Sequence, residues 1–409
     1  MKTGKNLTDL LDLNRAQIMR YLVLHPGCSR AELGAATGLT LASITKITRT
    51  LIEAGVIYEN GFAEGKKGRR SVGLSLNYDN YKVIAARLSW QRLELSVFDF
   101  MGNSYGEQIS IPVDSLNIEN IEKAADLLAK NIQRLKEEFP EIGAAGIATI
   151  GPYHRSTGSV LLPPYSKDPE KRHYYQILER LTGQLSLPVF MDHDASLGAL
   201  GYWRFHTDCT KPQVIMNILA GDGIGIGIVD SGKIYAGTSN CSSELGHITL
   251  NYQGRPCTCG STGCLNAYAS ARAMMELVKE QLGDYPDSKL NQYPSLGLYQ
   301  LLQCAKQNDP LAMKIISDEG EYLGHGIVSL LNIFDPDLIV ISGSVAAAGE
   351  PLLTSIQETF QARQSGFTRT PELTLFSSTT DLMLKGAAAF AMENMLNRPT
   401  KYMCSDIGE

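Results

Sequence analysis

The feature that most constrains this chain is a short stretch, ELGHITLNYQGRPCTCGSTGCLN, between Glu244 and Asn266. It contains one imidazole and three thiols, those of His247, Cys257, Cys259 and Cys264. A tetrahedral zinc site needs four such ligands, and intervening glycines let the backbone fold back around a metal. A disulfide within Cys-x-Cys is disfavoured because the two residues are too close in sequence. The stretch therefore predicts one structural Zn²⁺ per chain that fixes the loop carrying Glu244, with buried free thiols as the alternative.

The length of the chain and its lack of long apolar runs indicate a multidomain protein. At 409 residues it is too long for one ordinary core, so two or three domains are expected. No apolar stretch approaches the roughly 18 to 20 residues of a membrane span. The start, MKTGKNLTDLLDLNR, has charges where a signal peptide has its apolar region. We expect a cytoplasmic protein with no membrane insertion, in which cysteines stay reduced.

Net charge differs between the two ends of the chain. Residues 1 to 80 carry eleven Lys and Arg against seven Asp and Glu, a net charge of +4. The remaining residues carry 26 against 36, a net charge of −10. A basic head on an acidic body suggests a module that binds a polyanion, joined to a second unit. Chance clustering of solvated charge is the alternative.

Two helices are predicted near the start of the basic head. Apolar residues recur at helical spacing in NRAQIMRYLVLH, and Pro26-Gly27 then ends that helix. Ser29 and Glu32 have the spacing of a capping box, in which each side chain satisfies a backbone amide at the helix start. Gly38 closes this short second helix.

A third helix is predicted to read DNA. Thr40 caps it, Gly55 ends it, and its inner side carries Leu41, Ile44, Ile47 and Leu51. Small, hydroxyl and basic side chains on a helix after a tight turn are typical of a helix that enters a major groove. The candidate DNA contacts are Thr40, Ala42, Ser43, Thr45, Lys46 and Arg49.

A β-wing is predicted to follow. VIYENGFAEGKKGRRSVGLSLN reads as two strands joined by a glycine-rich turn that holds Lys66, Lys67, Arg69 and Arg70. Such side chains can contact phosphates or a narrow minor groove. The same unit could instead serve dimerisation or protein docking. Because helix pattern, outward face and basic wing agree, we expect a winged helix-turn-helix that binds double-stranded DNA.

The acidic body reads as an α/β protein with at least two sheets. Strand-like runs alternate with amphipathic helical segments such as 118–139. The strand-like runs are YKVIAARL, LELSVFDF, GAAGIATI, LPVFMDHD, QVIMNILA and DLIVISG. Gly-rich turns after some of them can cradle phosphates, although glycine there can also serve only a tight turn.

Several motifs of the body resemble those of the ROK family of bacterial sugar kinases and sugar-responsive repressors. The run E-x-G-H followed by C-x-C-G-x-x-G-C-L is the most specific. GIATIGPYHRSTG is similar to the family's sugar-side loop, MDHDAS to its catalytic-aspartate segment, GDGIGIGIVDSGKIYAG to its phosphate loop and FDPDLIVISGSV to its adenosine-side segment. The likeness extends over nearly the whole chain, and the winged helix looks like that of the repressor branch.

The resemblance implies a fold and a division into domains. A winged helix-turn-helix would be followed by two α/β lobes of the actin and sugar-kinase type, which is ribonuclease-H-like, with ligand between them. We expect the head at 1–80 and a first lobe at 81–195 that is completed by 385–409. The second lobe, at 196–384, would carry the zinc site, ligand cleft and dimerisation surface.

The resemblance also implies ligand contacts, at His193, Asp194, Glu244, His247 and Asn266. Asp194 could by its own chemistry accept a hydroxyl proton as a general base, or simply cap a helix. His193 replaces an asparagine of the family's kinases, and Asn266 replaces a glutamate with an uncharged amide. The expected ligand is thus an atypical or weakly bound sugar, or none.

Three kinase motifs for nucleotide phosphates are altered. The family's first phosphate motif is Asp-x-Gly-x-x-x-Thr, and this chain has Arg87, Ser89 and Gln91 in that segment. Arginine cannot ligate Mg²⁺. In the second, Asp222 replaces threonine, and a carboxylate about 4 Å from a phosphate charge costs about 4 kcal/mol at an effective dielectric of 20. The adenosine-side glycines have become Ser342-Gly343-Ser344, which narrows the room for a base. We therefore expect no catalysis and regard Asp194 as a vestigial base.

The sequence thus predicts a transcriptional regulator, a repressor, of carbohydrate uptake or metabolism genes. The expected partners are an operator in double-stranded DNA, on which the protein is nucleoid-associated, and a sugar or sugar-phosphate effector or a sugar-transport protein. We expect a homodimer or a dimer of dimers. The alternative is an ATP-dependent sugar kinase with an added DNA-binding head.

Overall fold

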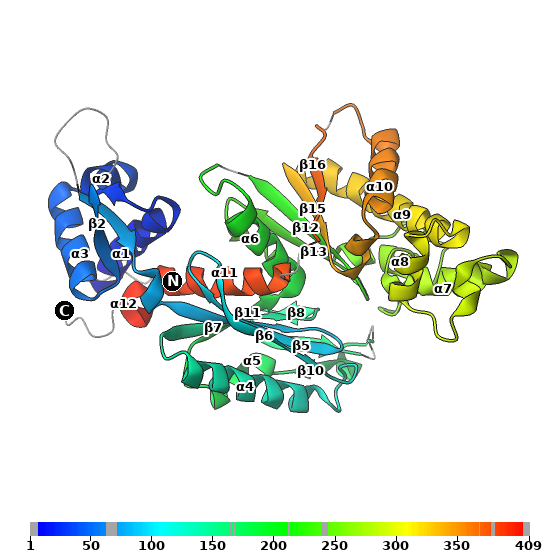
Figure 1. The fold of residues 1–409 in the computed structure, drawn as a ribbon, viewed down its shortest axis with the longest axis horizontal. Helices are drawn as coiled ribbons and strands as arrows, with labels where there is room; N and C mark the ends of the chain where they lie inside the picture. Colours follow the sequence, from blue (N-terminus) through cyan, green and yellow to red (C-terminus); the bar gives the residue numbers. More distant parts are fainter. Residues whose placement is uncertain are drawn as a thin grey trace.

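The computed structural model describes residues 7–62, 72–163, 165–166, 168–211, 213–238, 244–367, 369–377 and 381–403. Figure 1 shows a small helical head at one end, two sheet-bearing lobes, and helix α11 (Leu382–Asn397) extending from the head toward the lobes. None of the helices in these ranges is both long and apolar enough to cross a membrane.

The head is a winged helix, as predicted. Its elements are α1 (Leu7–Leu24), β1 (Cys28–Ser29), α2 (Arg30–Thr37), α3 (Leu41–Glu53), β2 (Ile57–Phe62) and β3 (Val72–Leu76). The strands pair antiparallel in the order β1-β3-β2. The capping box forms, because the Ser29 N–H donates to the Glu32 carboxylate at 2.7 Å and the Glu32 N–H donates to the Ser29 hydroxyl at 3.3 Å. The Thr40 hydroxyl caps α3 by accepting the N–H of Ser43 at 3.2 Å.

In the head, one expectation falls on residues that the structure does not describe, and another is wrong. The basic turn of the wing, with Lys66, Lys67, Arg69 and Arg70, lies outside the described residues. The prediction that Leu41 points inward is wrong: this side chain is 62% exposed, whereas Ile44 and Leu51 are fully buried. Leu41 is the first residue of α3, where side chains lean toward the helix N-terminus and so away from the core beneath the next turn.

The first lobe is built on a five-stranded sheet in the order β11-β7-β4-β5-β6. Its strands are β4 (Lys82–Leu88), β5 (Arg92–Asp99), β6 (Ser104–Pro112), β7 (Ile142–Thr149) and β11 (Val189–His193), and η1 (Tyr78–Asn80) leads into them. The first three form an antiparallel meander, and β7 and β11 add in parallel. The helix predicted at 118–139 forms as α4 (Ile121–Glu138) and packs with α5 (Ile177–Gln184).

A small antiparallel sheet extends from the first lobe between β7 and α5. It consists of β8 (Tyr153–His154), β9 (Ser159–Leu162) and β10 (His173–Tyr175), with the short turn η2 (Pro169–Lys171) before the last strand. This segment contains the motif GPYHRSTG that the sequence assigns to the sugar side.

The second lobe repeats the sheet of the first. Its order is β14-β13-β12-β15-β16, with three antiparallel strands followed by two parallel ones. The strands are β12 (Val214–Ala220), β13 (Ile224–Asp230), β14 (Lys233–Ile234), β15 (Leu338–Ser342) and β16 (Glu372–Leu375). The strands predicted in both lobes are present, and the repeated order confirms the expected pair of ribonuclease-H-like α/β lobes.

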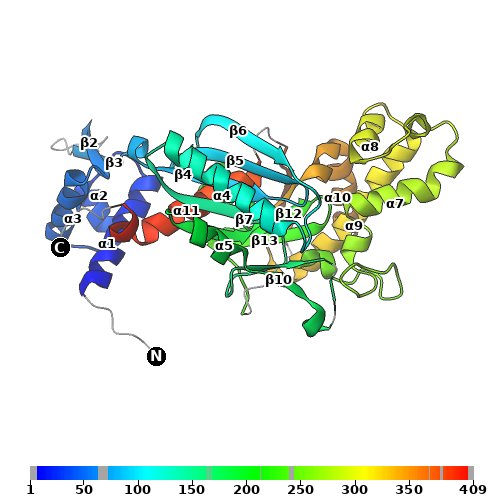
Figure 2. The ribbon, with the colours of Figure 1, turned by 90° about the horizontal axis from the view of Figure 1, so that it is seen from below.

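Helices and short 3₁₀ turns complete the second lobe. They are η3 (Leu245–His247), η4 (Leu265–Ala267), α7 (Ala271–Gln281), η5 (Leu282–Asp284), η6 (Lys289–Gln292), α8 (Leu298–Ala305), α9 (Pro310–Phe334), η7 (Ser344–Ala348) and α10 (Glu350–Arg363). Figure 2 shows α7 and α8 at the end of the molecule opposite the head.

Two helices pack together between the lobes. Helix α6 (Asp194–His206) contacts β12 and β13 of the second sheet, and α11 contacts β4 and β7 of the first. Glycines allow their close approach, since a Cβ on Gly386 would lie 1.7 Å from the carbonyl oxygen of Leu197. The boundaries 1–80, 81–195 with 385–409, and 196–384 remain a proposal, in which residue 385 lies inside α11.

The end of the chain binds the head to the body. After α11, the short helix α12 (Pro399–Tyr402) lies against α1. The guanidinium of Arg15 donates to the hydroxyl of Thr400 at 2.7 Å, and the Thr400 N–H donates to the Asp12 carboxylate at 3.0 Å. On α11 itself, Glu393 pairs with Arg20 of α1 at 3.6 Å. Helix α11 therefore contacts both the lobes and the winged-helix head.

We predict that Gly386→Ala lowers the free energy of unfolding by about 3 kcal/mol, because the new Cβ would overlap the α6 backbone. Gly183→Ala in α5 is the matched control, since a Cβ there meets nothing within 4 Å and should stabilise by about 0.5 to 1 kcal/mol. Urea unfolding of both variants measures the difference. Equal stability of the two variants would contradict the α6–α11 contact.

Candidate functional site

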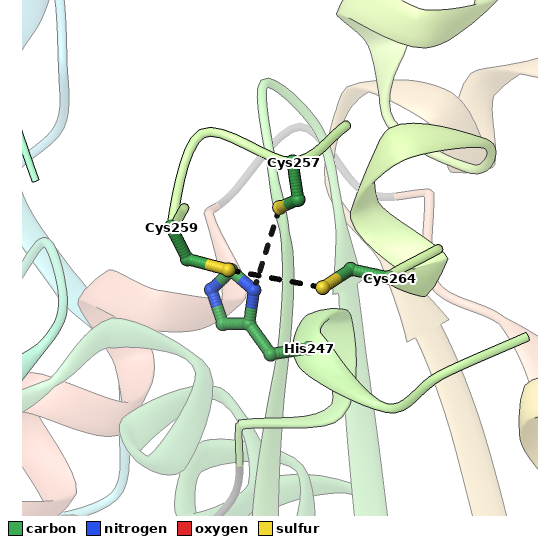
Figure 3. A group of neighbouring side chains, drawn as sticks. All are labelled: His247, Cys257, Cys259 and Cys264. Carbon is green, nitrogen blue, oxygen red and sulfur yellow. Dashed lines mark hydrogen bonds between the residues drawn. The ribbon is translucent and has the colours of Figure 1, made fainter. Parts of the chain in front are cut away.

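The four predicted zinc ligands lie together. Figure 3 shows His247, Cys257, Cys259 and Cys264 converging on one point, and their ligand atoms all lie within 4.8 Å of one another. The sulfurs of Cys259 and Cys264 are 3.7 Å apart, as are the Cys257 sulfur and the His247 Nδ1. Zinc bonds of about 2.3 Å to sulfur and 2.0 to 2.1 Å to nitrogen give tetrahedral edges of about 3.8 and 3.6 Å. The cluster can therefore hold a metal ion, and its dimensions fit zinc.

Local backbone geometry positions the four ligands. Isolated bridges join Thr249 to Cys264 and Pro256 to Thr262, so the segment folds back on itself. Gly263 has a φ of +75°, and a Cβ there would lie 1.6 Å from the carbonyl oxygen of Asn251. Only glycine fits this close approach, which explains the glycine that precedes the last cysteine.

The start of strand β13 contacts two segments that carry predicted ligand contacts, one with Asn266 and one with Glu244 and His247. The N–H of Ile224 donates to the Asn266 Oδ1 at 2.9 Å. A Cβ on Gly246, within the turn between Glu244 and His247, would lie 2.4 Å from the Ile224 carbonyl oxygen. The start of β13 therefore lies next to both Asn266 and the turn that carries Glu244 and His247.

Asn266 has a structural partner in this region. Because its carbonyl oxygen accepts from the Ile224 backbone, its amide nitrogen, a donor, is the half of the side chain that can serve a ligand. The glutamate of the family's kinases at this position would bring two acceptor oxygens and no donor. The substitution therefore changes the hydrogen-bonding character of the site as well as its charge.

His193 contacts both lobes. A Cβ on Gly151, after β7 of the first lobe, would lie 2.5 Å from its Nε2. A Cβ on Gly225, in β13 of the second lobe, would lie 3.5 Å from its Cε1. The imidazole therefore lies between the two lobes, next to Asp194.

Asp194 is the first residue of α6 and is buried. His193 occupies the cap position, so the alternative that Asp194 only caps this helix does not describe its geometry. One carboxylate oxygen accepts the N–H of Ala195 at 2.7 Å, and the other lies 3.6 Å from the guanidinium of Arg87. The carboxylate that a kinase would keep for the sugar hydroxyl is therefore engaged by a cation of the chain itself.

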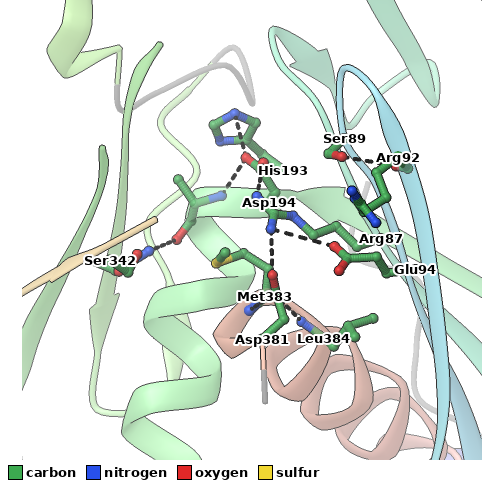
Figure 4. A network of polar contacts seen from close by, with 12 residues as sticks. Arg87, Ser89, Arg92, Glu94, His193, Asp194, Ser342, Asp381, Met383 and Leu384 are labelled. Carbon is green, nitrogen blue, oxygen red and sulfur yellow. Dashed lines mark hydrogen bonds and ion pairs between the residues drawn. The ribbon is translucent and has the colours of Figure 1, made fainter. Parts of the chain in front are cut away.

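Arg87 is the centre of an ionic network that joins strands β4 and β5 to the starts of α6 and α11. Figure 4 shows its guanidinium between three carboxylates, with Asp381 at 2.5 Å, Asp194 at 3.6 Å and Glu94 at 3.8 Å. Burial alone would lower the pKa of Arg87, but Asp381, Asp194 and Glu94 together raise it. Burial and the charge of Asp381 raise the pKa of Glu94. With all four groups ionised, this cluster carries more negative than positive charge.

The network also reaches helix α11. Asp381 caps this helix by accepting the N–H groups of Met383 and Leu384 at 2.8 and 3.1 Å. The same carboxylate accepts from Arg87. Arg87 therefore binds the cap residue of the helix whose other end contacts the winged-helix head.

The other altered kinase positions lie in turns at the ends of strands. Ser89 donates to the carbonyl of Arg92 at 2.9 Å in the β4–β5 turn, beside the exposed Gln91. Asp222 is exposed in the turn between β12 and β13. Next to it, a Cβ on Gly221 would lie 3.5 Å from the hydroxyl oxygen of Ser344, so the second phosphate loop and the adenosine-side segment are in close proximity.

Sequence reasoning missed two residues that lie near the predicted ligand contacts. Arg155 binds both carboxylate oxygens of Asp192, at 2.6 and 2.7 Å, and donates to Ser196 at 3.1 Å, which fixes the segment on either side of Asp194. Tyr165 lies near Glu244, and burial together with that charge raises the pKa of Tyr165 to about 12. The additional carboxylate in the motif MDHDAS, that of Asp192, is a sequence signal for a basic partner such as Arg155. The sequence contains no signal for Tyr165.

The predicted DNA contacts share one face of α3. Ala42, Thr45, Lys46 and Arg49 are exposed and, with Leu41, line an open hollow of about 490 Å³. Thr40 is also exposed and Ser43 is half-buried. These positions are compatible with docking of the helix into a groove.

Comparisons with known proteins match both parts of the chain. The model described as the ROK family matches residues 107–394, and the winged helix-turn-helix DNA-binding model matches residues 11–58. The xylose repressor of Caldicellulosiruptor bescii is 25% identical over 88% of this chain and 90% of its own. The DNA-binding transcriptional dual regulator NagC of Escherichia coli is 26% identical over 96% of this chain and 95% of its own.

A solved structure shares the fold. It is a ROK family transcriptional regulator described as a homolog of the Escherichia coli Mlc protein, and it is 24% identical in sequence. It covers 97% of this chain and 100% of its own, with a TM-score of 0.82. The likeness includes the head as well as both lobes.

We predict one zinc ion per chain by elemental analysis. Cys264→Ser should lose the metal and lower the melting temperature, because a structural site couples metal binding to folding. Cys209→Ser, outside the cluster, is the control and should keep one zinc. A wild-type protein that contains no zinc and melts at the same temperature with or without a chelator would contradict the metal site.

Proposed function

Because this chain belongs to the ROK family and begins with a winged helix, we propose that it is a DNA-binding transcriptional repressor that responds to a carbohydrate. The observation that carries the proposal is the union of an exposed recognition helix with a sugar-kinase-like body whose phosphate sites are altered. Relatives similar along nearly the whole chain are named as a xylose repressor and a DNA-binding transcriptional regulator. A regulator of transcription works on the chromosome, which supports a cytoplasmic location.

The body, on this proposal, does not transfer phosphate. A kinase needs positive charge and Mg²⁺ beside the transferred phosphate. Here Arg87 already binds Asp194, Asp381 and Glu94, which leaves it little capacity to stabilise an added anion. The exposed Asp222 would add repulsion, and Ser344 narrows the space beside the same turn. The alternative, a sugar kinase with an added head, requires these groups to accept a nucleotide.

The charges favour a neutral sugar over a sugar phosphate as the effector. Each of the two guanidinium groups near Asp194 is engaged: Arg87 has three carboxylates and Arg155 binds Asp192. A phosphate about 4 Å from an uncompensated carboxylate would cost about 4 kcal/mol at an effective dielectric of 20. Sugar hydroxyls, in contrast, can donate to Asp194 and Glu244 and accept from the Asn266 amide.

The zinc site, in this account, orders the ligand loop and takes no part in catalysis. Four protein ligands leave no position for water or substrate on the metal. His247 uses Nδ1 on the side of the thiols, so Nε2 is the nitrogen that remains for a ligand. Zinc would thereby hold the turn that carries Glu244 against the start of strand β13.

Helix α11 supplies a route from the cleft to DNA. Its first turn is bound by Arg87 through Asp381, and its far end contacts α1 through Glu393 and Arg20. A ligand that competes for Asp194 would change the partners of Arg87 and so favour one arrangement of α11. In a homodimer or dimer of dimers, two heads would then lose the spacing that matches two half-sites. Binding of a sugar-transport protein could bias the same helix.

We predict that the full-length protein binds duplex DNA with a steep salt dependence, because phosphate contacts dominate such affinity. On a duplex selected from a random library, Lys46→Ala should weaken binding by about 1 to 3 kcal/mol. Lys130→Ala, an exposed lysine on α4 of the body, is the control and should leave binding unchanged. Fluorescence anisotropy measures both; absence of duplex binding at low salt would refute the DNA-binding function.

We predict that at least one neutral sugar raises the melting temperature, because ligands of the native state stabilise it, and that a hexose which does so raises it more than its own 6-phosphate. A thermal-shift panel of xylose, glucose, N-acetylglucosamine and the two hexose 6-phosphates tests this. Asp194→Asn and Glu244→Gln should remove the effect, whereas Glu137→Gln on the exposed face of α4 should not. Stronger stabilisation by the phosphates would contradict a neutral effector, and sugar phosphorylation with ATP and Mg²⁺ at ordinary enzyme rates would support the kinase alternative.

A further inference from the structure

The hydroxyl groups of the recognition helix are used within the helix. The Thr40 and Ser43 hydroxyl oxygens lie 2.9 Å apart, and Thr40 also accepts the Ser43 N–H. The Thr45 hydroxyl donates to the carbonyl of Leu41 at 2.7 Å. The sequence suggested that such hydroxyls read bases, but these bonds leave them less free to do so.

The same bonds turn apolar groups outward. With its hydroxyl bound to the backbone one turn earlier, Thr45 presents its methyl group on the exposed face. Leu41 is 62% exposed, and Ala42 is also exposed. These three residues line one open hollow with Lys46 and Arg49. A single exposed leucine is common on protein surfaces. Here Leu41 lies beside the methyl groups of Ala42 and Thr45, on the side of α3 that would contact DNA in the proposed function.

Thymine is the base that such a surface fits. Among the base edges of the major groove, only thymine presents an apolar group, its C5 methyl. The first residues of a recognition helix are those that reach base edges, and Leu41, Ala42 and Thr45 are the first, second and fifth residues of α3. Lys46, on the same hollow, supplies positive charge that favours a phosphate-bearing partner over a neutral apolar one, whereas Arg49 is paired with Glu53 at 2.8 Å.

We propose that Leu41 and Thr45 form a methyl-reading surface that makes the protein specific for thymine in each half-site. The inference rests on the proposed DNA-binding function and deepens it by naming what the helix recognises. Apolar contact replaces hydroxyl readout by Ser43, whose side chain is bound to the cap.

Single replacement of thymine by deoxyuridine tests the proposal, because it removes only the C5 methyl. A duplex is first selected from a random library with the full-length protein, and each thymine is then replaced in turn. The wild-type protein should lose about fourfold in affinity at one or two positions per half-site, the effect of about one buried methyl group. Leu41→Ala should bind both duplexes equally at its position.

Two substitutions at Thr45 separate the methyl from the hydroxyl. Thr45→Ser keeps the hydroxyl and removes the methyl, and it should lose the sensitivity to deoxyuridine. Thr45→Val keeps a methyl and removes the hydroxyl, and it should retain the sensitivity. Ile333→Ala, an exposed apolar residue of the body, is the control for a general change in surface. Melting temperatures of all variants check that the fold is intact.

The outcomes distinguish this inference from the proposed function. DNA binding with no deoxyuridine effect, or with an effect that Leu41→Ala and Thr45→Ser leave unchanged, overturns methyl reading while DNA binding stands. No binding to any duplex overturns both. An effect that disappears in Leu41→Ala or Thr45→Ser and persists in Thr45→Val supports the inference.

Discussion

The close packing of α6 against α11 is the contact on which the rest of the structure depends. Gly386 allows the backbones to approach where any side chain would overlap Leu197, so the two helices behave as one layer between the lobes. Helix α6 begins with Asp194 and α11 is capped by Asp381, and Arg87 binds both carboxylates. The Arg87 network and the helix that contacts the head are therefore parts of one packed unit. Because close-packed interiors compress little, a displacement of α6 is transmitted to α11.

The cleft differs from a phosphate site through the placement of charge. A kinase brings positive charge to a negative ligand, whereas here Arg87 is bound by carboxylates of the chain itself. Breaking such a buried set of ions is costly, because any member left alone is uncompensated. On the proposed function, a neutral sugar that takes Asp194 from Arg87 leaves the guanidinium paired with Asp381 and Glu94, so the ion set is rearranged and no charge is left alone.

Local chemistry made part of this molecule predictable from its sequence. The capping box at Ser29, the cap at Thr40 and the cluster around Cys257 depend on residues close together in the chain, and all form. The strands of both lobes followed from apolar runs. These features need no knowledge of which distant segments meet.

Contacts between distant segments were not predictable in this way. Arg87 and Asp381 are 294 residues apart, and nothing in either segment identifies the other. The sequence predicts Asn266 as a ligand contact, but its bond to the Ile224 backbone depends on how the segment with the three cysteines meets β13. Leu41 was placed inside by its spacing, because helical periodicity does not show where the core ends below the first turn.

The central claim is that the cleft and the DNA-reading head are coupled. The most direct test is the affinity of the full-length protein for its selected duplex, measured by anisotropy with and without a saturating neutral sugar that raises its melting temperature. The account predicts a change of at least about fivefold, the lower end of usual coupling between two sites. Identical affinities under the two conditions would contradict it.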